Sequence, residues 1–295
     1  MKQFCYLQPA SLEEALELLV KYRSERLRVI AGGTDLLTAL RAGALTIDYL
    51  LDLAGLGLDA IVEIDGEVRI GALATFKSLL QNKLIQAKLP VLIAAAERIG
   101  AVQTRNLATI GGNLCSAIPS LDSAPSVMVL GARLRLITSG AERLVPVEKF
   151  FLGPRRTVLQ PGEILAEIIV PVPGKDFGAS FLKFGRRKAL TLAVVNVAAG
   201  LRLKAEQEIV EARVVLGAVA PTPIRARKAE AKLLGQKASP ELFMQAAAVA
   251  AGETAPISDL RASAAYRLHL SEVLVKRALN SAWQQVTGEV GRESA

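Results

Sequence analysis

The sequence predicts an α+β fold built from two domains, and three observations lead to that prediction. The chain has 295 residues, a length typical of two domains. Proline and glycine are concentrated between residues 160 and 175, which indicates a linker between a domain at 1–175 and a second domain at 176–290. In the second domain, β-rich runs precede helical runs, as expected of an antiparallel sheet with helices packed on it.

In the first domain, helical and extended patterns alternate. Ser11 and Glu14 have the spacing of a capping box, and leucines at helical spacing follow them toward Tyr22. Asp65-Gly66 lies between two apolar runs and predicts a hairpin turn. The stretch between 99 and 123 is expected to be a loop. The other elements that we expect are strands at 28–31, 49–53, 60–64, 67–73 and 133–138, and helices at 36–41, 76–88, 91–99 and 123–130.

The second domain begins with long β-rich runs. Those at 192–203 and 209–220 predict an antiparallel pair joined around Glu206-Gln207. Helical patterns follow at 224–234, 240–251 and 263–285. We interpret Tyr266-Arg267, in the last of these helices, as structural.

Composition limits the classes of function. Hydrophobic residues make up 51% of the chain and aromatic residues only 4%, so the cores must be aliphatic. The net charge of +8 is spread along the chain without an aromatic-basic motif, and we expect no nucleic acid partner. The phosphates of a cofactor, or an acidic partner subunit, would be attracted by that positive charge. We find neither a signal peptide nor an uncharged run of membrane-spanning length, and expect a cytoplasmic protein.

Residues for metal binding or acid–base catalysis are scarce. Cys5 and Cys115 are too few for a zinc site or a self-contained iron–sulfur cluster. His269 is the only histidine and belongs to an amphipathic helix. We therefore expect no metal site and no catalytic side chain.

Two Gly-Gly pairs, about 80 residues apart, are the main functional signal. Gly32-Gly33 follows a short run that predicts a buried strand and precedes a helix start with Asp35 in its first turn, which together make an anion site. Gly111-Gly112 predicts a turn whose successive N–H groups could form an anion-binding nest. The alternative for this pair is a tight turn without a ligand. Asp122 could accept hydrogen bonds from a sugar, so diphosphate and ribose together would describe half of a dinucleotide.

With these motifs the chain resembles the FAD-binding (medium) subunit of the molybdenum hydroxylases, which include carbon monoxide dehydrogenase, bacterial xanthine dehydrogenases and related aldehyde and aromatic hydroxylases. The likeness continues through Glu163-Ile164-Leu165, 181–187 and 265–267. It implies a two-part FAD-binding domain of the p-cresol methylhydroxylase type, followed by an α+β domain. The resemblance assigns the flavin site to Val29, Ile30, Ala31, Gly32, Gly33, Thr34, Asp35 and Leu36, to Thr109, Ile110, Gly111, Gly112 and Asn113, and to Asp122, Leu165 and Lys183.

Within that set, the resemblance implies that the two glycine loops hold the FAD diphosphate and that Asp122 holds the adenosine ribose. Leu165 and Lys183 would lie near the flavin ring, although an ordinary strand lysine is the alternative for Lys183. The basic segment 183–188 is expected to be a hairpin, either a solvated loop or a lip that receives a nucleotide acceptor or a partner.

The resemblance implies electron transfer. Substrate would be oxidised at molybdenum-pterin on a large subunit, and electrons would pass through 2Fe-2S clusters on a small subunit to FAD here, then to NAD+ or a quinone. The three-chain unit would be paired. Two alternatives stay open, a stand-alone FAD-dependent oxidoreductase with its own organic substrate and a nucleotide-binding regulatory module without redox chemistry.

Overall fold

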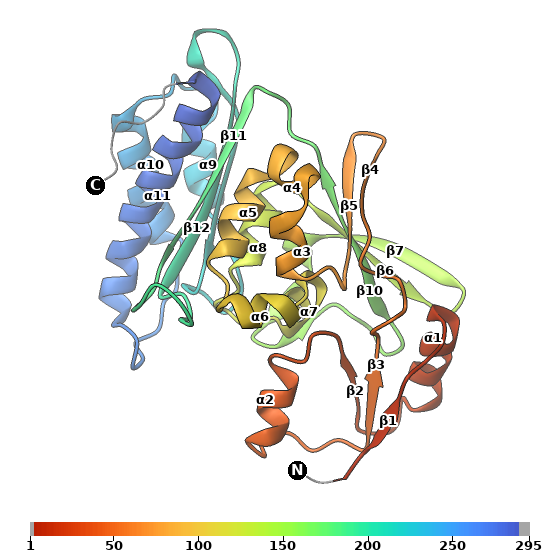
Figure 1. Ribbon diagram of the computed structural model, residues 1–295. Helices are drawn as coiled ribbons and strands as arrows, with labels where there is room; N and C mark the ends of the chain where they lie inside the picture. The colour runs from red at the N-terminus through yellow and green to blue at the C-terminus, as the bar shows by residue number, and fades with distance from the viewer. Residues whose placement is uncertain (1–2, 289–295) are drawn as a thin grey trace.

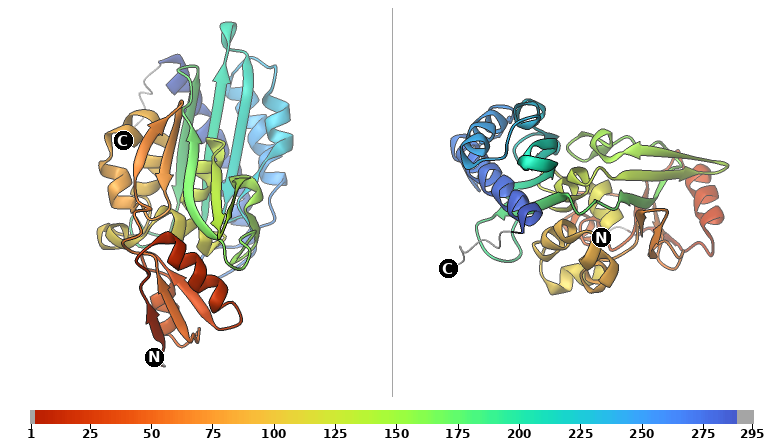
Figure 2. Two further views of the ribbon diagram at one scale, coloured as in Figure 1. Left: turned by 90° about the vertical axis from the view of Figure 1, so that its right-hand side faces the viewer. Right: turned by 90° about the horizontal axis from the view of Figure 1, so that it is seen from above.

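The computed structural model describes residues 3–288 and has three units along the chain (Figure 1). A small N-terminal unit is followed by a middle unit with a five-stranded sheet and by a C-terminal unit with a four-stranded sheet. Helices α10 and α11 lie on the far side of the molecule from α1 in Figures 1 and 2. The predicted α+β class is confirmed. Within the described residues, no helix is both long and apolar enough to cross a membrane.

The N-terminal unit is a parallel sheet in the order β1-β3-β2 with two helices. Its elements are β1 (Cys5–Leu7), α1 (Leu12–Lys21), β2 (Leu27–Ile30), α2 (Leu36–Arg41) and β3 (Tyr49–Asp52). Ser11 caps α1 as predicted, by accepting a hydrogen bond from the Glu14 N–H. The expectation that the strand before the first glycine pair is buried is wrong, because β2 is an edge strand and Val29 is 39% exposed.

The middle unit contains an antiparallel sheet in the order β4-β5-β10-β6-β7. Its strands are β4 (Ile61–Ile64), β5 (Glu67–Gly71), β6 (Arg133–Thr138), β7 (Ala141–Pro146) and β10 (Ile164–Pro171), beside the 3-10 turn η1 (Val147–Lys149) and the short pair β8 (Phe151–Gly153) and β9 (Arg156–Thr157). The hairpin at Asp65-Gly66 is confirmed, with positive φ at both residues. The predicted linker at 160–175 is wrong, because β10 is the central strand of this sheet.

Six short helices accompany this sheet: α3 (Phe76–Gln81), α4 (Lys83–Lys88), α5 (Pro90–Glu97), α6 (Val102–Leu107), α7 (Ile110–Ser116) and α8 (Ser123–Val129). The helix predicted at 76–88 is divided at Asn82, whose side chain caps α4 by accepting from the Ile85 N–H. The expected loop between 99 and 123 is also corrected, because α6 and α7 occupy most of it.

The C-terminal unit carries an antiparallel sheet in the order β11-β12-β13-β14. Its elements are β11 (Phe177–Phe184), β12 (Val195–Leu203), the 3-10 turn η2 (Ala205–Gln207), β13 (Ile209–Gly217), β14 (Ile224–Arg225), α9 (Arg227–Leu233), α10 (Pro240–Gly252) and α11 (Ala264–Thr287). The pair joined near Glu206-Gln207 is confirmed. The predicted helix at 224–234 begins later than expected, because Ile224 and Arg225 pair with β13. Arg267 is structural as interpreted: it is buried, and it donates to the Val194 and Ala218 carbonyls.

The middle and C-terminal units share a broad contact. All seven residues of α8 are buried, and α8 contacts both β12 and β13. An ion network lies across the same boundary. In it, Glu230 accepts from the Val214 N–H and from Arg225, while Arg225 and Arg227 also reach Glu148 of the middle unit. Because the Glu230 side chain is only 6% exposed, its hydrogen bonds are shielded from water.

We expect Glu230→Ala to destabilise the chain by about 3 kcal/mol, since removing one partner leaves buried polar groups uncompensated. Arg227→Ala, in the same network, should cost less than about 1 kcal/mol, because Arg227 is largely exposed. Urea unfolding of the two variants measures both values. Equal losses would show that burial does not set the strength of this network.

Candidate cofactor-binding site

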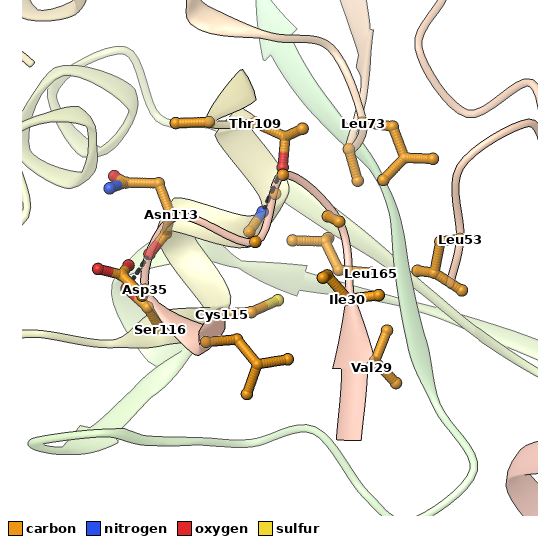
Figure 3. Close-up of a pocket in the computed structure, with 18 of the residues that line it drawn as sticks. Val29, Ile30, Asp35, Leu53, Leu73, Thr109, Asn113, Cys115, Ser116 and Leu165 are labelled. Atoms are coloured by element: carbon orange, nitrogen blue, oxygen red, sulfur yellow. Dashed lines mark hydrogen bonds between the residues drawn. The ribbon is translucent and has the colours of Figure 1, made fainter. Parts of the chain in front are cut away.

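A cavity of about 280 Å³ lies between the N-terminal and middle units. Figure 3 shows its lining, which is polar at one end and apolar at the other. Asp35, Asn113 and Ser116 lie close together at the polar end. Leu53 and Leu73 lie at the apolar end. A ligand with a charged polar part and a flat apolar part matches this lining.

Most of the residues predicted for the site line this cavity. From the predicted set, the lining includes Val29, Ile30, Ala31, Gly32, Gly33, Thr34, Asp35, Leu36, Thr109, Gly111, Gly112, Asn113 and Leu165. Ile110 lies behind it in the core and is fully buried. Asp122 and Lys183 are also outside the lining.

The first glycine pair forms a turn with unused backbone donors. Gly33 has φ +69°, a conformation that side chains disfavour. Within the described chain, the backbone N–H groups of Gly32, Gly33 and Thr34 have no recorded hydrogen-bond acceptor. Because these residues line the cavity, their N–H groups could serve an anionic ligand.

The second glycine pair differs from the predicted nest. Both glycines lie in the first turn of α7, and neither has a positive φ. The Gly111 N–H donates to the Ala72 carbonyl at 2.8 Å, and the Gly112 N–H donates to Thr109 Oγ1 at 3.1 Å. These donors are therefore already used within the chain, and the prediction of a free nest here is wrong.

Steric limits explain three of the four glycines. A Cβ on Gly32 would lie 1.9 Å from the Leu107 carbonyl oxygen, and a Cβ on Gly111 would lie 2.5 Å from the Ala72 Cβ. A Cβ on Gly112 would lie 2.8 Å from Thr109 Oγ1, the atom that caps α7. Glycine at Gly32 lets the N-terminal and middle units approach, and glycine at Gly111 and Gly112 allows close contacts within the middle unit.

Asp122 and Lys183 form a buried ion pair with each other. Lys183 Nζ lies 2.5 Å from Asp122 Oδ2 and also donates to the Arg98 and Thr191 carbonyls. Asn196 Nδ2 donates to Asp122 Oδ1 at 2.9 Å. Burial raises the pKa of the Asp122 carboxyl, while Lys183 and Asn196 act in the opposite direction. The group joins α5, α8, β11 and β12.

This buried group is connected to the cavity wall. Ser123, next to Asp122, donates from its Oγ to Asn113 Oδ1 at 2.6 Å. Asn113 lines the cavity, so its amide is oriented from behind by the start of α8. The bond therefore connects the residue next to Asp122 with the second glycine segment.

Sequence reasoning missed the other lining residues, which are Leu53, Ala72, Leu73, Ala108, Cys115, Ser116, Leu159, Glu163 and Ile164. Glu163 is held by Arg143 in a two-bond ion pair, and Arg143 is the main reason that the Glu163 pKa lies below its usual value. Burial raises the pKa of the Cys115 thiol to about 12, so this cysteine is protonated at neutral pH. Only Glu163-Ile164-Leu165 carried a sequence signal, through the family resemblance.

The two cysteines and the lone histidine can also be placed. Among residues 3–288, no group of three or more His, Cys, Asp or Glu side chains has an arrangement that could hold a metal ion. Cys5 and Cys115 are free thiols. His269 lies on the exposed side of α11, in the unit farthest from the cavity.

Comparisons with known proteins agree with this geometry. The family described as "FAD binding domain in molybdopterin dehydrogenase" matches residues 2–173, and "CO dehydrogenase flavoprotein C-terminal domain" matches residues 180–282. The xanthine dehydrogenase FAD-binding subunit of Escherichia coli O157:H7 is 32% identical over 292 residues, which cover 97% of this chain and 98% of that protein.

Two solved structures extend the likeness to the fold. Carbon monoxide dehydrogenase from Hydrogenophaga pseudoflava gives a TM-score of 0.93 at 33% identity and covers 96% of this chain and 98% of that one. Quinoline 2-oxidoreductase from Pseudomonas putida 86 gives a TM-score of 0.90 at 29% identity, with 97% and 99% covered. The resemblance drawn from the two glycine pairs is thereby confirmed. The chain belongs to the FAD-binding flavoprotein subunits of the molybdenum hydroxylases, the family of the xanthine and carbon monoxide dehydrogenases.

Proposed function

We propose that this chain holds FAD in the cavity between its N-terminal and middle units and passes electrons from a partner's iron–sulfur clusters to an acceptor such as NAD+ or a quinone. The observation that carries the proposal is the cavity itself, polar at one end, apolar at the other and walled by glycines that admit no side chain. Such a cavity suits an extended molecule with a diphosphate and a flat ring system.

Different parts of the chain would hold different parts of the cofactor. The unused N–H groups of Gly32, Gly33 and Thr34 would bind the diphosphate. Leu53, Leu73 and other apolar lining residues would exclude water from the ring. FAD supplies the redox chemistry, because a flavin takes electrons singly and gives them up as a pair, while the protein supplies position and electrostatics.

Asp122 and Lys183 enter the proposal as a buried pair that is connected to α7 through Ser123 and Asn113. A ribose hydroxyl that reached Asp122 would share a carboxylate already bonded to Lys183 and Asn196. A flavin contact by Lys183 would likewise share an ammonium that already has three acceptors. Through Ser123, the pair also fixes the orientation of the Asn113 amide.

The source of the electrons would be another chain. Two cysteines cannot ligate a cluster that requires four thiolates, so the 2Fe-2S clusters belong to a small partner subunit and the molybdenum-pterin to a large one. We further propose that the three chains assemble as a paired unit, and that residues 1–175 form the cofactor domain and 176–290 the second domain. Residues 289 and 290 lie outside the described range.

Gly32→Ala should reduce FAD retention at least tenfold, because a Cβ 1.9 Å from the Leu107 carbonyl forces the cavity wall to move. Gly252→Ala is the matched control, since a Cβ there meets nothing within 4 Å. Equilibrium titration of stripped protein with FAD measures both. Circular dichroism and thermal unfolding separate loss of binding from loss of fold, and wild-type affinity in a folded Gly32→Ala variant would contradict the assignment of the site.

We expect the bound flavin to be FAD and not FMN, because the family that matches residues 2–173 is an FAD binding domain and three unused donors of the first loop could serve a diphosphate. Mass spectrometry of the cofactor released by acid identifies it. A chain purified without cofactor is first incubated with FAD and with FMN separately. Retention of FMN alone would overturn the assignment of the adenosine half.

The proposed function is tested by expressing the chain alone and together with its large and small partner chains. The isolated chain should bind FAD but give no oxidation of purine, aldehyde or aromatic substrates. The complex should reduce a dye or NAD+ with substrate, and should lose NAD+ reduction when FAD is stripped. Substrate turnover by the isolated chain would instead favour a stand-alone flavoenzyme.

A further inference from the structure

The surface beside the cavity is formed by α6 and by the loop at 185–192, which lie side by side. The Leu190 N–H donates to the Gly100 carbonyl at 3.1 Å, just before α6 begins. Lys183 Nζ donates to the carbonyls of both Arg98 and Thr191, which fastens the base of the loop to the end of α5. Figure 1 shows the same adjacency, with the turn between β11 and β12 next to α6. We call this surface the cleft-side face.

Large apolar side chains are exposed on the cleft-side face to an unusual degree. Val102 is 63% exposed and Leu107 60%, and α6 contains no buried residue. Leu190 is 56% exposed and Leu192 53%. The Leu260 side chain is 98% exposed, and its carbonyl accepts from Arg186 of the same loop. Exposed apolar groups gathered in this way mark a surface that another molecule covers.

The segments 98–121 and 177–205 carry only positive charge, while Glu97 precedes the first of them and Asp259, beside Leu260, is paired with Arg261 and Arg267. Asp and Glu do not occur between Arg98 and Leu121 or between Phe177 and Ala205. The basic residues here are Arg98, Arg105, Arg186, Arg187 and Lys188. Among the ion pairs recorded within residues 3–288, none includes any of these five. Positive charge on the cleft-side face is therefore not compensated by the chain's own carboxylates.

We propose that the cleft-side face docks an acidic, apolar-centred surface of the cluster-bearing subunit that delivers electrons. The proposal rests on the proposed function. Apolar side chains with interspersed arginines are typical of the core of a protein interface, and uncompensated positive charge selects an acidic partner and accelerates its association.

The position of the face explains why this partner should occupy it. The Leu107 carbonyl packs directly against Gly32 at the edge of the cavity, and Ala108 and Thr109, which follow α6, line the cavity. A subunit seated on α6 therefore rests against the back of the cavity wall. An anionic membrane would match the charge equally well, but it would bring no electron donor to this wall.

The test uses the full-length chain loaded with FAD and the purified small subunit, with affinity measured by biolayer interferometry. The charge variant is Arg187→Glu with Lys188→Glu, and its matched control on α11 is Lys276→Glu with Arg277→Glu. The apolar variant is Val102→Ser with Leu192→Ser, and its matched control is Leu144→Ser with Leu152→Ser on β7 and β8. All eight substituted positions are exposed in the free chain.

Both face variants should bind the small subunit at least roughly tenfold more weakly than the wild type, with FAD content unchanged. Both controls should bind like the wild type, and only the charge variant should lose the salt dependence of binding. Wild-type affinity in the two face variants would overturn the proposal. The proposal would also be overturned if the face variants bound phosphatidylglycerol vesicles more weakly but bound the small subunit as the wild type does, because the face would then contact a membrane. A wild-type chain that takes up no FAD would refute the proposed function instead.

Discussion

The architecture of the cavity depends on a backbone-to-backbone contact between two units of the chain. Gly32 passes so close to the Leu107 carbonyl that no Cβ would fit, since it would lie 1.9 Å from the carbonyl oxygen. The first N–H groups of α7 donate to carbonyls at the end of β5, with Ile110 bonded to Ala74 and Gly111 to Ala72. These contacts fix the cavity wall through main-chain atoms. The two glycine pairs therefore have different roles. The first offers N–H donors to a ligand, and the second allows α7 to pack against the end of β5.

Local patterns predicted much of the fold, and the failures have a common physical cause. The Asp65-Gly66 hairpin and the β12–β13 pair could be inferred because turn residues and neighbouring strands specify them. Strand β10 could not, since proline and glycine at its two ends resemble a linker and only its neighbours in space make it central. Helix α7 has two glycines in its first turn, each of which disfavours a helix by about 1 kcal/mol. It forms because Thr109 caps it and the Ala72 carbonyl accepts from the Gly111 N–H.

The site was predictable to the extent that its residue types are rare. Paired glycines stand out in a sequence, and they led to both walls of the cavity. Leu53 and Leu73 do not, because nothing distinguishes a leucine facing a cavity from one in a core. The bond between Asp122 and Lys183 spans 61 positions and joins two units, so no spacing argument could reveal that the two side chains bind each other. The family resemblance identified both residues as part of the site but did not indicate that they form an ion pair with each other.

Helix α6 connects the cavity to the outer surface. Its last carbonyl meets Gly32 on the inner side, while Val102 and Leu107 are exposed on the outer side. None of its residues is fully buried. It contacts α3, its Arg105 donates to the Ile99 carbonyl, and Lys183 ties the chain just before it to the C-terminal unit. A molecule that covers the outer side of α6 would also supply the packing that α6 lacks. A partner bound to the cleft-side face would therefore also fix the position of the cavity wall, and with it the geometry in which the flavin is held.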